Sequence, residues 1–151
     1  MKTIRKILLL AFAFATATLF TSCSKSDPTP AATVADGFTW TENGGTNVIT
    51  GYTPTFYNSS NVLRANNTTG NSLLIFSLSA HTIGTYNIGA TNSVEYFFPG
   101  FTINNSFTPS SGSLIIVSNT NGKISGTFTA SGSQGTISSI QGTFNNVTVQ
   151  P

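Results

Sequence analysis

The chain has 151 residues, a formal net charge of +2, and only 7% charged but 11% aromatic side chains. Its aromatic content disfavours intrinsic disorder, which is typical of chains poor in aromatic and β-branched residues. The basic residues form no cluster beyond the first six positions. Nucleic-acid binding is therefore disfavoured, since it needs several Lys or Arg contacts to phosphate.

The N-terminal segment has the order of a secretory signal peptide. Lys2, Arg5 and Lys6 precede an apolar and small-residue stretch over 7–20. As a helix, this stretch would extend about 21 Å at about 1.5 Å per residue. That length is short of the roughly 30 Å hydrocarbon core that a transmembrane helix crosses. We therefore expect residues 1–22 to be a cleaved signal peptide.

The only cysteine, Cys23, stands at the end of this stretch, directly after Leu-Phe-Thr-Ser. Its polar neighbours disfavour a buried packing role, and a lone thiol has no partner for an intramolecular disulfide. The junction resembles the lipobox of bacterial lipoproteins, although Phe20 stands where the commonest pattern has Leu. The resemblance implies a lipid on Cys23, cleavage before it and attachment of the mature chain to a membrane.

Removal of residues 1–22 leaves three basic side chains against four acidic ones, a net charge of −1. Residues 23–36 contain two prolines and little apolar content, which predicts a lipidated cysteine followed by a flexible tether. The folded domain is expected over 37–151. We expect it at the bacterial cell envelope, anchored to the outer membrane, on either the periplasmic or the surface side.

Short Val, Ile, Phe, Tyr and Thr runs, separated by Gly, Asn, Ser and Pro, predict an all-β domain. We expect an antiparallel β-sandwich, with a calycin-like up-and-down barrel as the alternative. Strands are predicted at 38–41, 46–52, 55–57, 62–65, 73–76, 94–98 and 114–117. The pair Asn43-Gly44 predicts a tight turn after the first strand. The runs 73–76 and 114–117 are apolar on both faces and are expected to be central strands.

The C-terminal third contains a near-repeat. The run Ile-Ser-Gly-Thr-Phe over 124–128 returns as Ile-Gln-Gly-Thr-Phe over 140–144, with a looser echo over 83–86. In a strand, the Ile, Gly and Phe of each run share one face. The glycine therefore leaves room for a bulky neighbour or marks a bend.

Near the C-terminus, the apolar residues of the strand pattern switch twice between odd and even positions. This predicts bulges near 138–139 and 145–146. Together with the leader and the run 83–86, the pattern over 112–149 is similar to that of small Bacteroidota lipoproteins with an uncharacterised β domain. This resemblance implies architecture and location, and it supplies no catalytic motif.

The sequence offers little for catalysis or metal binding. His81 is the only histidine, and Glu95 is its nearest carboxylate, but the chain has no Gly-x-Ser-x-Gly elbow. Asp36 and Glu42 lie in sequences typical of turns. One His and one Cys do not make a zinc site, and no Asp-rich loop suggests calcium. We predict a non-enzymatic protein without cofactors; an envelope hydrolase using His81 is the less favoured alternative.

Binding remains as the expected role, with a glycan or a protein as the ligand. Two aromatic clusters supply the candidate binding residues Tyr52, Phe56, Tyr57, Phe97 and Phe101. The competing interpretation is that most aromatic rings of these clusters pack in the core. The first alternative, ahead of the hydrolase, is a carrier of a small apolar ligand, which requires an unfilled interior in a calycin-like barrel.

Overall fold

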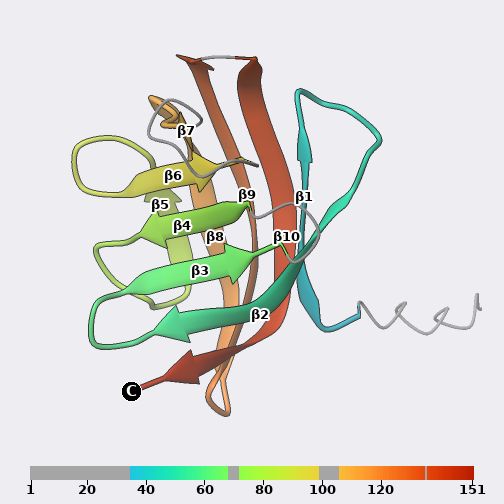
Figure 1. The fold of residues 1–151 in the computed structure, drawn as a ribbon. Helices are drawn as coiled ribbons and strands as arrows, with labels where there is room; N and C mark the ends of the chain where they lie inside the picture. The colour runs from blue at the N-terminus through green and yellow to red at the C-terminus, as the bar shows by residue number, and fades with distance from the viewer. Residues whose placement is uncertain (1–34, 68–71, 99–105, 135) are drawn as a thin grey trace, which may run out of the picture. The chain divides into compact units, whose positions relative to one another are not determined.

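The computed structural model describes residues 35–67, 72–98, 106–134 and 136–151, and these form a curled sheet of ten strands (Figure 1). The strands are β1 (Gly37–Glu42), β2 (Ile49–Tyr57), β3 (Val62–Asn66), β4 (Leu73–Ser77), β5 (Gly84–Asn87), β6 (Ser93–Phe97), β7 (Ser106–Phe107), β8 (Ser111–Thr120), β9 (Lys123–Gln134) and β10 (Ile137–Gln150). Their order is β5-β8-β9-β10-β1-β2-β3-β4-β6-β7, and consecutive neighbours are antiparallel. The predicted all-β class is confirmed. None of the described residues forms a helix long and apolar enough to cross a bilayer.

The sheet curls so that its two halves face each other. Figure 1 shows β3, β4 and β6 running across β8, β9 and β10. The crossing resembles orthogonal sheet packing, in which bent or bulged strands pass from one half to the other. β10 is such a strand, because it pairs with β1 through Asn145 and then pairs in parallel with β2 over Thr148–Gln150.

A bulge allows β10 to make this change. Its register against β9 shifts between Phe144 and Val147, and Asn146 has a φ of 51°. The Asn146 backbone N–H donates to Ser125 Oγ at 2.9 Å, outside the regular ladder. A second shift lies between Ile137 and Ser139. Both bulges predicted from the apolar phase are confirmed.

β2 differs from its prediction. The sequence suggested separate strands over 46–52 and 55–57, whereas β2 is one strand, Ile49–Tyr57. Its pairing with β3 shifts between Tyr52 and Thr55, and Thr53 has a φ of 43°. This bulge accommodates Pro54, which cannot donate to the ladder. The proline therefore bends the strand where the sequence analysis expected it to end.

The two doubly apolar runs also have different environments. In β4, Leu73, Leu74 and Phe76 are buried, as expected for a central strand. In β8, Leu114 and Ile116 are buried, but Val117 is 60% exposed. β8 lies beside the edge strand β5, where its outer face remains accessible. β8 is an interior strand, as expected, with one face buried and the other only partly covered.

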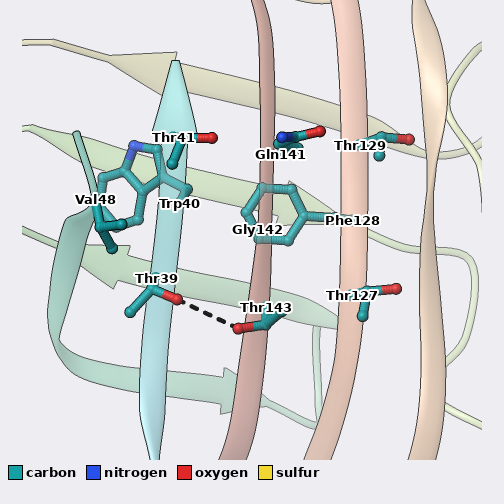
Figure 2. A pocket seen from close by; sticks show the side chains of 10 residues that line it. All are labelled: Thr39, Trp40, Thr41, Val48, Thr127, Phe128, Thr129, Gln141, Gly142 and Thr143. Carbon is teal, nitrogen blue, oxygen red and sulfur yellow. Dashed lines mark hydrogen bonds between the residues drawn. The ribbon is translucent and has the colours of Figure 1, made fainter. Parts of the chain in front are cut away.

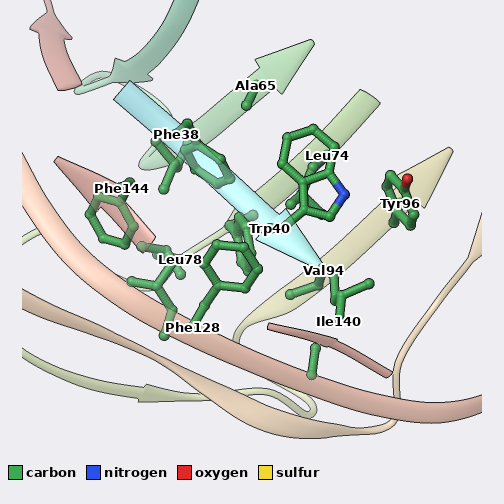
Figure 3. Close-up of a cluster of buried hydrophobic side chains, with 14 of the residues drawn as sticks. Phe38, Trp40, Ala65, Leu74, Leu78, Val94, Tyr96, Phe128, Ile140 and Phe144 are labelled. Carbon is green, nitrogen blue, oxygen red and sulfur yellow. The ribbon is translucent and has the colours of Figure 1, made fainter. Parts of the chain in front are cut away.

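Aromatic rings fill the space between the two halves of the sheet (Figure 3). Phe38 is fully buried at their centre, with its ring centroid 5.4 Å from that of Phe128 and 6.0 Å from that of Phe144. Phe76 reaches Phe128 from the opposite half at 4.8 Å. Burial of each of these rings stabilises the core, because it removes a large apolar surface from water.

The turn after β1 has the conformation that its sequence predicts. Asn43 and Gly44 have φ values of 53° and 66°, typical of a tight hairpin turn. The Asn43 side chain also reaches the start of β10. Its Oδ1 accepts from the Ser138 backbone N–H at 2.7 Å, and its Nδ2 donates to the Thr136 carbonyl oxygen at 3.0 Å. Asn43 thus connects the β1 turn to the β9–β10 hairpin.

We expect Asn43→Ala to lower the free energy of unfolding by about 2 kcal/mol, since it removes these hydrogen bonds and replaces a residue that tolerates positive φ with one that does so less readily. Asn43→Gly keeps the favourable φ and should cost only about 1 kcal/mol. Urea unfolding, followed by the fluorescence of the only tryptophan, Trp40, measures both values. Equal stability of Asn43→Ala and the native chain would contradict this prediction.

Candidate functional site

The predicted site residues do not form one surface. Tyr52 is 60% exposed, Tyr57 and Phe97 are half-buried, and Phe56 is fully buried in the core. Phe56 therefore presents no surface to a ligand, because its position in β2 faces inward opposite Leu63. Cys23, the rest of the tether up to residue 34, and Phe101 lie outside the described residues.

Tyr52 and Phe97 share one cross-strand row but lie on strands separated by β3 and β4. At about 4.8 Å per strand, their backbones are about 14 Å apart. Tyr57 lies in a different row, opposite Val62. The accessible members of the aromatic set are thus dispersed: Tyr52 and Tyr57 lie on β2, Phe97 lies on β6, and β3 and β4 separate the two strands.

His81 packs as a structural residue. Its Nδ1 lies 2.7 Å from Asn61 Oδ1, and its ring centroid lies 5.7 Å from that of Phe56. The Asn119 side chain donates to the His81 carbonyl oxygen at 2.8 Å. His81 lies outside the strands and is half-buried. Within the described ranges, no three His, Cys, Asp or Glu side chains are placed to share a metal ion.

A different feature, a groove of about 370 Å³, lies on the outer face of β1, β10 and β9. It is lined by residues 39–41, 141–143 and 127–129 and by Val48, and we call it the threonine groove. The central residues of the three triplets face the core, so their backbones form the floor. Figure 2 shows the flanking side chains as two rows. The buried Trp40 and Phe128 rings appear between the rows in this view and belong to the inward-facing central residues.

Strand register builds the two walls of the threonine groove. Side chains alternate between the two faces of a strand, so the residues flanking each inward position point outward. The first row contains Thr50, Thr39, Thr143, Thr127, Ile115 and Thr85. The second contains Thr41, Gln141, Thr129, Ser113 and Asn87. Five threonines thus occupy one row that crosses six strands.

Inward-facing glycines allow the strands beneath the groove to pack closely. Gly142 of β10 is paired with Trp40 on one side and Phe128 on the other. Gly126 of β9 is in turn paired with Phe144. The two copies of the near-repeat therefore place each phenylalanine opposite the glycine of the other. The prediction that these glycines leave room for bulky neighbours is confirmed.

The threonine groove carries no charged side chain among its lining residues. The Thr39 and Thr143 hydroxyl oxygens lie 3.3 Å apart across β1 and β10. The Val48 side chain, 59% exposed, contributes apolar surface to the lining. Hydroxyl, amide and methyl groups thus make up the side-chain surface that faces solvent.

Charged groups lie elsewhere in the described part of the chain. Asp36 and Lys123 form an ion pair of 3.7 Å beyond the groove, and both side chains are largely exposed. Glu42 accepts a hydrogen bond of 2.5 Å from the Tyr96 hydroxyl. Burial, reinforced by this hydrogen bond, raises the pKa of the Tyr96 hydroxyl above its ordinary value.

Comparison with known proteins adds no family assignment. No protein-family model matches the sequence, and no curated protein or solved structure is significantly similar to it. The candidate site therefore depends on the geometry and chemistry of this chain.

The threonine groove was not predicted, because threonine entered the sequence-based prediction only as a residue that favours strands. A usable signal was present in the triplets Thr-Trp-Thr over 39–41 and Thr-Phe-Thr over 127–129. Their alternation predicts two threonines on the outer face of each strand. Alternation does not reveal that β10 lies between these strands and completes both rows.

Proposed function

We propose that the protein is a lipid-anchored, non-enzymatic binding protein of the bacterial cell envelope, whose β domain binds its ligand in the threonine groove. The observation that carries this proposal is an uncharged groove of about 370 Å³ on the outer face of a sheet whose inner face is filled. Concave sites with a few convergent polar groups are the usual form of ligand sites.

The signal-like leader and the lipobox-like junction at Cys23 support the anchor. Diacylglycerol attachment and amino-terminal acylation would supply two or three acyl chains. At about 0.8 kcal/mol per buried methylene, such chains meet the two-signal requirement for stable membrane attachment. We place the mature protein at the outer membrane.

Two alternatives have less support. A hydrolase using His81 would need a nucleophile or carboxylate at its ring, whereas Nδ1 is bonded to the Asn61 amide oxygen. A carrier of a small apolar ligand needs open space inside the sheet. That interior contains fully buried large side chains, among them Trp40, Phe38 and Phe76, while the groove lies outside it.

We expect Cys23→Ser to abolish lipid attachment, because the acyl donor is transferred to the thiol. The full chain, produced in a bacterium that processes lipoproteins, should lose labelled palmitate and move from the membrane fraction to the soluble fraction. Ser24→Ala keeps the thiol and serves as the matched control, with label and membrane attachment retained. A Cys23→Ser chain that remains labelled and membrane-bound would overturn the proposed anchor.

A further inference from the structure

We infer that the ligand of the threonine groove is an uncharged, polyhydroxylated chain, a segment of neutral polysaccharide lying across β1, β10 and β9. This inference rests on the proposed function for the location of the site and adds the chemical class of its occupant. Three properties of the groove support it: charge, surface chemistry and shape.

The absence of charged side chains from the two rows disfavours charged polymers as ligands. Neither row contains Lys, Arg, Asp, Glu or His at its paired positions. An anionic polysaccharide, a nucleic acid or a charged peptide would lose hydration here without gaining an opposite charge, and such desolvation is costly. A neutral polymer avoids this cost.

The surface chemistry of the groove fits sugar hydroxyls and C–H groups. Each threonine presents a hydroxyl, which can both donate and accept, next to a methyl group. Thr143 and Thr39 already share a hydrogen bond within the first row, between β10 and β1, and Gln141 adds an amide with donor and acceptor atoms. Sugars present the same mixture of hydroxyls and apolar ring faces.

Thr41 provides a hydroxyl that the described protein leaves unsatisfied. Its Oγ1 is buried and has no hydrogen-bond partner among the described residues. A buried hydroxyl without a partner destabilises the fold, because it has lost its hydrogen bonds to water. A rotation about χ1 to another staggered rotamer moves the Thr41 hydroxyl, and a rotamer that turns it toward the groove would give it a partner on a ligand.

Shape favours a chain over a compact molecule or a flat surface. The two rows are about 7 Å apart along each strand, and side chains repeat about every 4.8 Å across the strands. The rows continue from the groove to Ser113 and Ile115 of β8. Because adjacent strands twist by roughly 20–25°, the hydroxyls do not share one plane. A chain of pyranose units can follow this curved line.

The test measures retention of the detergent-solubilised full chain on immobilised polysaccharides. The neutral set contains β-glucan, xyloglucan, galactomannan and dextran, and the anionic set contains alginate, polygalacturonate and hyaluronan. We expect retention by at least one neutral polymer. Thr143→Lys, at an exposed position in the centre of the first row, should weaken that retention at least tenfold.

Two further variants keep the test independent of folding. Ser77→Lys places the same charge at an exposed position of β4, in the other half of the sheet, and should bind like the native chain. Thr143→Val keeps the shape of the side chain and removes its hydroxyl, so it should weaken binding about three- to tenfold. Unchanged Trp40 fluorescence and unfolding midpoint establish that each variant is folded.

Several results would overturn the inference. These are retention only on anionic polymers, retention on none, or an equal effect of Thr143→Lys and Ser77→Lys. Native chain that elutes as a dimer and becomes monomeric in Thr143→Lys would instead assign the groove to a second copy. The anchor at Cys23 has its own readout, so failure of the glycan assignment and failure of the anchor are distinguishable.

Discussion

Gly142→Ala is expected to destabilise the β domain by about 3 kcal/mol or more, an effect at the upper end for overpacked cores. A β-carbon at this position would collide with the Thr39 carbonyl oxygen and would lie 2.7 Å from Phe128 Cζ and 2.9 Å from Trp40 Cα. Two of these three neighbours are backbone atoms of β1. Relief therefore requires β1 and β10 to separate, which lengthens their ladder hydrogen bonds.

The matched control is Gly89→Ala, since a β-carbon on Gly89 has no heavy atom within 4 Å beyond its chain neighbours. This control should change stability by less than about 0.5 kcal/mol, as for most surface substitutions. Urea unfolding monitored by Trp40 fluorescence gives both values. Gly126→Ala should behave like Gly142→Ala because it meets the Ile115 carbonyl oxygen and the Phe144 ring. A Gly142→Ala chain as stable as the control would contradict the close-packing argument.

These glycines illustrate what the sequence can predict. The near-repeat alone indicated that glycine and phenylalanine share a face within each strand. It also implied that a bulky side chain fills the space next to the glycine, because an empty gap there would reduce the packing energy of the core. Only the antiparallel register, with Phe128 opposite Gly142 and Phe144 opposite Gly126, shows that each copy fills the space of the other. Local periodicity was sufficient to predict which side chains share a face of a strand. The residue that lies opposite each glycine follows only from the strand topology.

The candidate site was less predictable for the same reason. The triplets at 39–41 and 127–129 are separated by more than 80 residues, and β10 lies between their strands. A row of side chains exists only after register aligns them, and nothing in a single strand specifies its neighbour. The aromatic set was chosen by residue type instead, and it combined the exposed Tyr52 with the buried Phe56.

Phe38→Ala is expected to cost about 3–5 kcal/mol, the range for truncating a buried aromatic side chain. The Phe38 ring lies at the centre of the core, with its centroid within 6.4 Å of those of Trp40, Phe76, Phe128 and Phe144. These neighbours belong to both halves of the sheet. The cavity would therefore weaken the contact between the halves as well as the packing within one of them.

A loss of this size is a large fraction of the 5–15 kcal/mol that stabilises a typical domain. Tyr52→Ala removes an aromatic ring of similar size from an exposed position of β2 and should cost less than about 1 kcal/mol. In urea, the unfolding midpoint of Phe38→Ala should fall. The slope of the unfolding free energy against urea concentration should stay unchanged, because the substitution leaves the compactness of both states the same. Equal costs for Phe38→Ala and Tyr52→Ala would mean that the facing halves do not depend on this ring. The outer-face rows would then require another source of rigidity, because their alignment follows from the register that the core holds in place.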